Sequence, residues 1–362
     1  MPDFTSALYL GMRHDHASLR PWAALTTGRP AVLQAPPGEA TVGARLAGLI
    51  GCEAAVLAPS TLHLALDLLD LVAVGRVALL VEAGTYPILR WGLPRAAVRG
   101  AAVRGFAHND PAALAAAIRV VARQGRRPVV LADGLCPATG APAPLPDYLA
   151  LVEAHAGLLV IDDTQALGIL GRAPAAGRPW GIDGGGTAAW HGLWSPALMV
   201  VASLAKGLGV PVAVLAGSRT LIAACAAQGL TRTHCSPPSA AHLAAADRAL
   251  TENRTTGAAR RARLLRSIER LRARLHAQGI GVDGGRLPVQ TPRLGIRAPT
   301  IHAGLAAAGV TTVLHRPRDG HPPALSLLVT AHHQPWEIDR AAHLLARLAS
   351  RPAPRRAPED PR

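Results

Sequence analysis

The sequence predicts an α/β protein with a large, mainly parallel sheet and a smaller α+β unit. Over residues 54–217, short apolar runs alternate with stretches of helical periodicity. Strands that are apolar throughout are typical of a parallel sheet covered by helices on both faces. Beyond residue 280 the pattern changes to short strands and two helices. With 362 residues, the chain is long enough for both units.

The expected elements follow from these patterns in chain order. Strands of the large sheet are expected at 54–58, 77–82, 128–133, 157–162, 197–203 and 212–217, with helices between them at 61–74, 111–123 and 146–156. Further helices are expected at 16–25, 41–51, 218–228 and, in an arginine-rich stretch, 240–277. The last part of the chain should contain strands at 289–296, 311–314 and 325–330 and helices at 299–308 and 335–348. The predicted divisions are an N-terminal segment of residues 1–50, a large domain of 51–250, a small α+β domain of 251–350 and a disordered tail of 351–362.

Lys206 is the only lysine in the protein, because the other basic side chains besides histidine are all arginine. It lies in Ser203-Leu-Ala-Lys-Gly-Leu-Gly209, a glycine-rich turn between two predicted strands. A lysine amine can lose its proton when it is desolvated and then attack a carbonyl, whereas arginine stays charged. We interpret Lys206 as a nucleophilic amine. From this stretch alone, an ordinary turn lysine is an equally good interpretation.

Polar residues follow several predicted strands, at the edge where ligands bind in parallel sheets. Ser60 and Thr61 open a predicted helix whose free N–H groups either bind a phosphate or are simply capped. Asp133 ends another predicted strand. Asp162 ends the apolar run 158–161, so its carboxylate should be buried and should need a cationic or hydrogen-bonding partner.

Composition restricts the other sites and partners. Cys52, Cys136, Cys225 and Cys235 lack the spacing of a disulfide framework or of metal ligands, so no metal site is expected. The net charge of +15 suits phosphorylated cofactors, acidic carrier proteins or nucleic acid, but no nucleic-acid-binding motif accompanies the arginines. We therefore do not expect nucleic acid as the partner. The absence of a membrane-length apolar run and of signal-peptide features favours a cytoplasmic protein without membrane contact.

Five stretches, taken together, resemble the α-oxoamine synthase family of fold-type I pyridoxal phosphate enzymes, the group of 8-amino-7-oxononanoate synthase and glycine C-acetyltransferase. They are Phe4-Thr-Ser-Ala-Leu-Tyr-Leu-Gly11, Gly105-Phe-Ala-His-Asn-Asp110, Val160-Ile-Asp-Asp-Thr-Gln-Ala-Leu-Gly-Ile-Leu-Gly171, Ser203-Leu-Ala-Lys-Gly-Leu-Gly209 and Val329-Thr-Ala-His-His333. The resemblance runs over most of residues 4–350. It implies pyridoxal 5'-phosphate as cofactor, a cofactor-binding large domain at 51–250, an N-terminal segment that joins the small domain, and a homodimer.

The resemblance also implies roles for individual residues. Lys206 would form a Schiff base with the cofactor and later move the Cα proton of the substrate. Asp162 would pair with the pyridinium nitrogen and keep it protonated, so that the ring can accept the electrons of a carbanion. The implied binding residues are Ser60, Thr61 and Ser203 for the phosphate, Tyr86 as the ring stacked on the cofactor, Asp133 beside the cofactor, and Arg316 for the substrate carboxylate.

Two departures from the family pattern bear on the chemistry. Gln165 stands where the synthases have a histidine that bonds the phenolic oxygen of the cofactor and takes part in condensation. Glutamine can donate that hydrogen bond but cannot exchange a proton near neutral pH. The glycine- and serine-rich loop of the family is replaced by residues 29–38, so substrate entry or specificity should differ. The tryptophan-containing insert at 177–195 is either a lid, a dimer contact or a packed surface loop.

The sequence therefore predicts a pyridoxal phosphate-dependent acyltransferase that condenses an amino acid with an acyl thioester of coenzyme A or an acyl carrier protein, with decarboxylation. Gln165 keeps a second hypothesis open, namely an aminotransferase, a decarboxylase or another carbon–carbon bond-forming enzyme with the same cofactor. A third hypothesis is an inactive binding protein on the same fold. The presence of both Lys206 and Asp162 disfavours it.

Overall fold

The computed structural model describes residues 1–136, 138–317 and 322–350. Its described residues form two units. The larger unit comprises residues 10–136 and 141–261, and the smaller unit comprises residues 1–9, 138–140, 262–317 and 322–350. The tail predicted at 351–362 lies outside the described residues.

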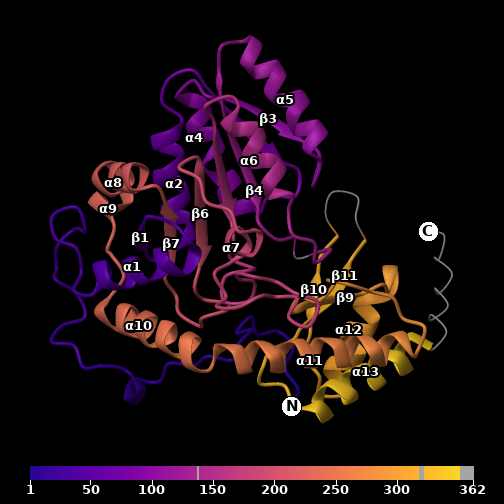
Figure 1. The fold of residues 1–362 in the computed structure, drawn as a ribbon. Helices are drawn as coiled ribbons and strands as arrows, with labels where there is room; N and C mark the ends of the chain where they lie inside the picture. Colours follow the sequence, from indigo (N-terminus) through magenta and orange to yellow (C-terminus); the bar gives the residue numbers. More distant parts are fainter. Residues whose placement is uncertain (137, 318–321, 351–362) are drawn as a thin grey trace, which may run out of the picture. The chain divides into compact units, whose positions relative to one another are not determined.

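A seven-stranded sheet forms the centre of the larger unit, in the order β1-β7-β6-β5-β4-β2-β3 (Figure 1). The strands are β1 (Ala54–Ala58), β2 (Val77–Glu82), β3 (Ala102–Phe106), β4 (Arg127–Asp133), β5 (Leu158–Asp162), β6 (Leu198–Ser203) and β7 (Ala213–Gly217). Only β7 runs against its two neighbours, and the pairs from β6 to β3 are all parallel. The predicted mainly parallel sheet is confirmed.

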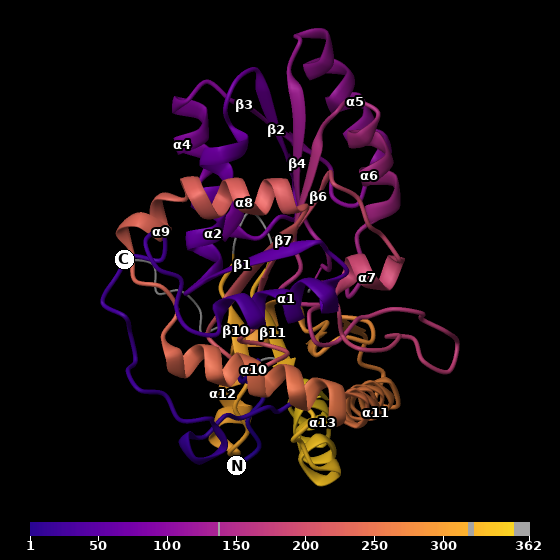
Figure 2. The ribbon, with the colours of Figure 1, turned by 60° about the vertical axis from the view of Figure 1, so that its left-hand side comes forward.

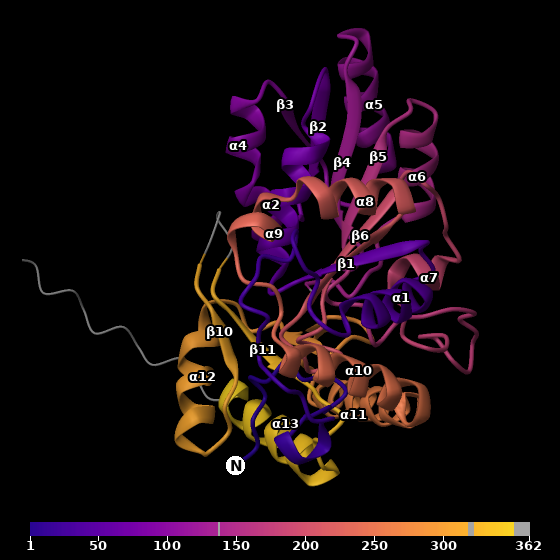
Figure 3. The ribbon, with the colours of Figure 1, turned by 90° about the vertical axis from the view of Figure 1, so that its left-hand side faces the viewer.

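Helices cover both faces of this sheet. The helices α2 (Thr61–Val72) and α8 (Arg219–Gln228) pack on one face, and α1 (Glu39–Ile50), α5 (Pro111–Arg123) and α6 (Leu145–Glu153) pack on the other (Figures 1 and 3). Leu131, Val160 and Val201 belong to the core on the α2 side. Because side chains alternate along a strand, the residues two positions further also face that side. The order of the sheet thus places Asp133, Asp162 and Ser203 on one face at one edge.

The remaining helices of the larger unit are short, apart from α10. They are η1 (His16–Ser18), α3 (Pro87–Trp91), α4 (Leu93–Val98), α7 (Thr187–His191), α9 (Leu230–His234) and α10 (Ala240–Thr255). The helix predicted at 16–25 is wrong, since only the single turn η1 forms. Pro21 lacks a backbone N–H and disfavours a helical conformation at Arg20, so the turn cannot extend.

Two further differences have local causes. The sequence pattern did not predict β3, because the middle three residues of this edge strand, Val103, Arg104 and Gly105, are exposed and form no apolar run. The helix predicted at 240–277 is two helices, α10 and α11 (Gly257–His276). The break falls at Thr256, whose φ of −120° is not helical, and β-branched threonine followed by glycine is a poor helix continuation.

The smaller unit contains an antiparallel four-stranded sheet in the order β10-β11-β9-β8. Its elements are β8 (Val282–Asp283), β9 (Val289–Pro292), η2 (Gly295–Arg297), α12 (Ala298–Ala307), β10 (Val313–His315), β11 (Ala324–Leu328) and α13 (Pro335–Ser350), several of which are visible in Figure 2. The first residues of the chain are part of this unit, because Phe4 stacks on His333 with ring centres 4.2 Å apart. None of the helices in the described parts of the chain is both long and apolar enough to cross a bilayer.

Candidate active site

Asp133 and Asp162 lie side by side at the carboxyl ends of β4 and β5. They are register partners in the parallel pairing of these strands, and both face the α2 side of the sheet. Asp162 is only 8% exposed. This is the edge at which open α/β sheets bind ligands. The structure therefore brings two of the predicted site residues together.

The electrostatics of this edge couple three groups. Burial raises the pKa of Asp162, against the hydrogen bond from the Thr164 N–H, 2.9 Å away, and the charge of Lys206. Burial, and then the neighbouring charge of Asp162, raise the pKa of Asp133 to about 8. Burial also lowers the pKa of the Lys206 amine, whereas the attraction of Asp162 and Asp133 acts in the opposite direction. Burial thus disfavours the charged forms of the amine and of both carboxyl groups, while their opposite charges favour them.

Lys206 is held in a closed turn of residues 203–209, which we call the Lys206 turn. Inside it, the Leu204 carbonyl accepts hydrogen bonds from the N–H groups of Leu208 (3.1 Å) and Val210 (3.2 Å). Gly207 packs so closely on residue 167 that a Cβ would lie 2.2 Å from the Leu167 carbonyl oxygen. Only glycine fits there. The turn is therefore fixed from within and from the segment that follows Asp162.

Thr164 connects Asp162 to the start of the Lys206 turn. Its N–H donates to Asp162 Oδ1, and its Oγ1 accepts a hydrogen bond of 3.0 Å from the Ser203 N–H. The Ser203 hydroxyl accepts the Ala205 N–H at 3.2 Å. Asp162, Ser203 and Lys206 are thereby held by one hydrogen-bonded segment. Sequence reasoning did not single out Thr164, although its place two residues after the aspartate was visible.

Tyr86 lies in the loop after β2 and is 49% exposed. Its N–H donates to Asp133 Oδ1 at 3.0 Å, which links the predicted stacking residue to the paired carboxyl groups. Arg90 clamps the same loop, because its guanidinium donates to the carbonyl oxygens of Glu82, Ala83 and Thr85 at 2.7–3.0 Å. Sequence reasoning missed Arg90. An arginine in an arginine-rich chain carries no signal of such a role.

Sequence reasoning also missed Asp163, a residue whose buried hydrogen bonds stabilise the local fold. It is fully buried on the opposite face of the sheet from Asp162, where it accepts hydrogen bonds from the N–H and the hydroxyl of Thr187. Burial raises its pKa to about 6, against these hydrogen bonds. A Cβ on Gly134 or Gly186 would come within 2.4 Å of its carboxylate oxygens. The run Gly184-Gly-Gly186 was the available signal for this close packing.

Ser60 and Thr61 begin α2, as predicted for a phosphate-binding helix start. Ser60 occupies the N-cap position, but its side chain does not cap the helix. Its hydroxyl instead pairs with His63 Nδ1 at 2.8 Å. The first backbone N–H groups of α2 therefore have no side-chain cap from Ser60, which suits an anion.

The other predicted site residues are placed as follows. Gln165 is half-buried, three residues after Asp162 in the larger unit, and Arg316 is exposed after β10 in the smaller unit. In the 177–195 insert, Trp180 is buried and the Trp190 ring N–H donates to the Pro179 carbonyl at 2.9 Å. This part of the insert packs onto itself.

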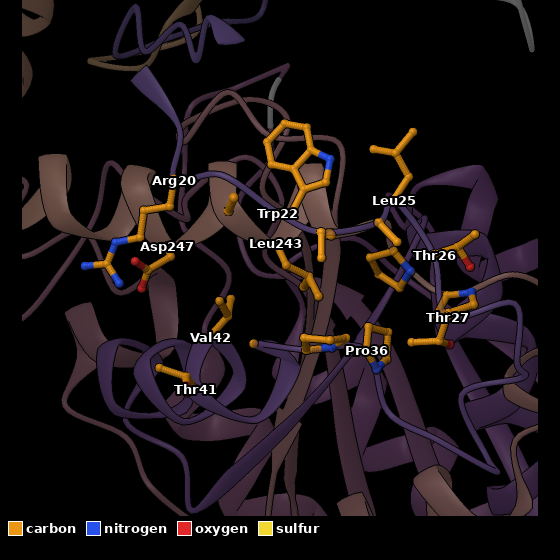
Figure 4. Close-up of a pocket in the computed structure, with 18 of the residues that line it drawn as sticks. Arg20, Trp22, Leu25, Thr26, Thr27, Pro36, Thr41, Val42, Leu243 and Asp247 are labelled. Atoms are coloured by element: carbon orange, nitrogen blue, oxygen red, sulfur yellow. The ribbon is translucent and has the colours of Figure 1, made fainter. Parts of the chain in front are cut away.

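A separate cavity of about 530 Å³ opens in the larger unit between the 20–27 segment, α1 and α10 (Figure 4). Trp22, Pro36, Val42 and Leu243 form its apolar walls, and Arg20 and Asp247 lie at one end of it. None of the predicted site residues is among the described residues that line it. A search for the active site by cavity shape alone would therefore have selected a site that does not contain Lys206.

Comparison with known proteins agrees with this geometry. Residues 17–291 match the family described as aminotransferase class I and II. The chain is 30% identical over 351 residues to a protein of Thermosynechococcus vestitus provisionally named 8-amino-7-oxononanoate synthase, covering 95% of this chain and 79% of the relative. It is 28% identical to the 8-amino-7-oxononanoate synthase of Nitrosococcus oceani, covering 94% and 81%. Serine palmitoyltransferase of Sphingomonas wittichii shares the fold, with a TM-score of 0.81 at 16% identity over 96% and 86% of the two chains.

The fold and these matches define a pyridoxal phosphate-dependent transferase of fold type I. The chain belongs to the aminotransferase class I and II family, in its α-oxoamine synthase branch. The predicted family, fold, enzyme class and cofactor are thereby confirmed. The roles of the individual site residues remain predictions.

Proposed function

We propose that this enzyme joins an amino acid to an acyl thioester with loss of carbon dioxide. The bond from Cα to the carboxylate breaks, a bond from Cα to the acyl carbon forms, and the thiol and carbon dioxide leave. The observation that carries the proposal is the half-buried amine of Lys206, which interacts with the buried carboxyl group of Asp162 and the half-buried one of Asp133. Relatives named as 8-amino-7-oxononanoate synthases and serine palmitoyltransferases support this type of reaction.

The residues of the chain suit pyridoxal phosphate. Burial disfavours the charged form of the Lys206 amine and so favours its nucleophilic form. Asp162 is a buried carboxyl group of the kind that pairs with a protonated ring nitrogen. The uncapped start of α2 and the Ser203 hydroxyl suit the phosphate, and the exposed ring of Tyr86 suits stacking. Bound to these residues, the cofactor supplies an electron sink for negative charge at the substrate Cα.

Within this proposal, Lys206 Nζ would hold the cofactor, accept the proton of the substrate Cα before condensation and return a proton to Cα after carbon dioxide has left. Asp162 would pair with the ring nitrogen of the cofactor and favour the protonated form of that nitrogen. Asp133 and Arg90 act on the Tyr86 loop, through the Tyr86 N–H and through three loop carbonyls. Arg316 would hold the substrate carboxylate through a bidentate ion pair.

Gln165 supports a second candidate, in which the same cofactor serves an aminotransferase, a decarboxylase or another carbon–carbon bond-forming reaction. A glutamine can hold the phenolic oxygen of the cofactor by a hydrogen bond, but it cannot deliver a proton to a condensing acyl group. The two candidates differ in their need for an acyl thioester.

The proposed partners are coenzyme A or an acyl carrier protein as acyl donor, and a second copy of the chain. The net charge of +15 suits the phosphates of coenzyme A or an acidic carrier protein. Leu33 is 76% exposed in the 29–38 segment that replaces the family loop, and Leu25, shortly before this segment, is 56% exposed. Exposed apolar side chains close together in sequence suit a subunit interface. Light scattering on the purified protein would check the dimer.

The decisive experiment combines a spectrum with product analysis. The protein is mixed with pyridoxal phosphate, and its visible absorbance is recorded before and after borohydride for wild type and Lys206→Ala. We expect a cofactor band that borohydride fixes covalently in wild type alone. Amino acids labelled in the carboxylate are then supplied with and without acyl thioester. Labelled carbon dioxide and an aminoketone that both require the thioester support the condensation, whereas turnover without a thioester supports the second candidate.

A further inference from the structure

His14 connects a distant part of the chain to the Lys206 turn. Its Nε2 lies 2.9 Å from the carbonyl oxygen of Leu208, which is 194 positions away in sequence and two residues after Lys206. A carbonyl oxygen only accepts hydrogen bonds, so Nε2 is the donor and carries a proton in this contact. His14 Nδ1 is buried and has no hydrogen-bond partner among the described residues. Among the described residues, the hydrogen bond of this ring is thus directed at the turn.

The segment that carries His14 is itself fixed. Arg260 Nη1 on α11 donates to the carbonyl oxygens of Leu10 (3.1 Å) and Gly11 (3.2 Å). Glu252 on α10 holds the Arg260 guanidinium at 3.1 Å. The backbone just before His14 is therefore held by residues of two helices. Because His14 lies on this fixed segment, its hydrogen bond can hold the Leu208 carbonyl in place.

The same turn is also held at Gly207, by its close contact with Leu167 and Gly168. Leu208 itself is fully buried, so its carbonyl needs a protein partner. His14 supplies that partner. The two residues that follow Lys206 are thus both held, Gly207 by close packing and Leu208 by the hydrogen bond from His14.

We propose that His14 is a positioning residue for Lys206, acting through the Leu208 carbonyl to hold the amine in its desolvated place beside Asp162 and Asp133. Without this hydrogen bond, the buried carbonyl would turn toward water and the turn would open. The amine would then gain solvent and approach the behaviour of an exposed lysine. The inference rests on the proposed role of Lys206 and adds a residue that neither the family match nor the sequence motifs assign.

A protein with one lysine allows a direct test that needs neither cofactor nor substrate. The full, cofactor-free chain is labelled with acetic anhydride, and the Lys206 peptide is separated from the N-terminal peptide by mass spectrometry. The labelling rate as a function of pH reports the pKa of the Lys206 amine. The charged groups acting on it are Asp162 on β5 and Asp133 on β4. We expect the wild-type midpoint to lie below the ordinary lysine value.

The variants separate the hydrogen bond from mere ring packing. His14→Phe keeps a ring but has no hydrogen-bond donor. We expect the labelling midpoint of Lys206 to rise by about one pH unit in this variant. At pH 8, the fraction of uncharged, reactive amine would then be about tenfold lower. His14→Gln keeps an N–H that can reach the carbonyl, and we expect a midpoint close to wild type. His14→Ala is a second variant without a donor, in case His14→Phe does not fold. His16→Phe, at an exposed histidine of the same segment, should leave the midpoint unchanged.

Two results would overturn the inference. The first is that the labelling midpoint of Lys206 lies below the ordinary lysine value in wild type and stays at the same pH in His14→Phe and His14→Ala. The other is a shift in His14→Gln as large as that in His14→Phe, because the hydrogen bond would then not be the cause. A wild-type midpoint at the ordinary lysine value would instead contradict the desolvated amine on which the proposed function rests. Cofactor uptake, measured separately, tells the two failures apart.

Discussion

Asp133 and Asp162 are register partners at the ends of two adjacent parallel strands, and they place two carboxyl groups beside one amine. Parallel pairing keeps both side chains on the same face, so the charge of Asp162 adds to burial in raising the pKa of Asp133. The cofactor-free protein therefore keeps protons on this edge at a pH where isolated aspartates have lost them. This relationship determines how the site should respond to pH and substitution.

Asp133→Asn should change the pH dependence of stability in the cofactor-free protein. The pKa of Asp133 is about 8 in the folded state and is near 3.8 when unfolded. A raised carboxyl pKa stabilises the fold fully below pH 4, and this stabilisation is lost as the pH rises toward 8. The asparagine keeps the acceptor for the Tyr86 N–H but cannot ionise. In urea unfolding, the variant should gain about 1–3 kcal/mol relative to wild type between pH 5 and pH 8. If the unfolding free energies of the two proteins changed with pH in the same way, the raised pKa of Asp133 would be contradicted.

Asp162→Asn should leave the fold intact and remove most of the activity. Asparagine fits the space and can still accept the Thr164 N–H, but it cannot keep a ring nitrogen protonated. We expect kcat/KM to fall by about 100-fold or more, equivalent to roughly 2.7 kcal/mol of transition-state stabilisation. Steady-state kinetics and circular dichroism check the two halves of this prediction. Unchanged turnover would remove Asp162 from the proposed mechanism.

Tyr86→Ala should weaken cofactor binding, because the exposed ring is proposed to stack on the cofactor. Loss of one aromatic contact of about 0.5–1.5 kcal/mol corresponds to a roughly 2- to 13-fold higher dissociation constant. Tyr86→Phe keeps the ring and should bind normally. Absorbance titration with pyridoxal phosphate measures both. Equal affinity of all three proteins would place the ring outside the cofactor site.

Gly186→Ala should be strongly destabilising. Its φ is +95°, and an added Cβ would lie 2.0 Å from Asp163 Oδ2. The backbone strain and the displaced, buried carboxylate together should reduce the unfolding free energy by about 2–4 kcal/mol. Gly192→Ala is the matched control, because its φ of +67° is also positive but nothing lies within 4 Å of the added Cβ. That variant should lose only about 1 kcal/mol. Urea unfolding of both variants would show whether the Asp163 contact is the cause. If both variants lost the same unfolding free energy, backbone strain alone would explain the loss.

Gln165→His should distinguish the two candidate reactions. A histidine can exchange a proton near neutral pH, so it should raise acyl condensation by about tenfold or more if that step is limited by proton transfer. Product formation with an amino acid and an acyl thioester measures the effect. A variant that condenses no faster, while it loses a reaction that wild type performs without thioester, would favour the second candidate.

The sequence by itself determined the alternation of apolar strands and helices, and with it the mainly parallel sheet, because burial on both faces leaves continuous apolar runs. It also marked Lys206, since a single lysine among arginines is a chemical exception, and Asp162, since a carboxyl group after 158–161 must be buried. The order of family motifs then indicated the cofactor and the enzyme class.

The tertiary structure alone decided the features that depend on long-range contacts or exposed edges. β3 shows no apolar run because it is an edge strand, and the segment 16–25 is irregular because Pro21 stops its first turn. Arg90 and His14 form hydrogen bonds to backbone carbonyls, and because every residue has a carbonyl, the sequence does not indicate which one is the partner. Local periodicity records which faces are buried, but only the folded chain shows which distant groups meet there.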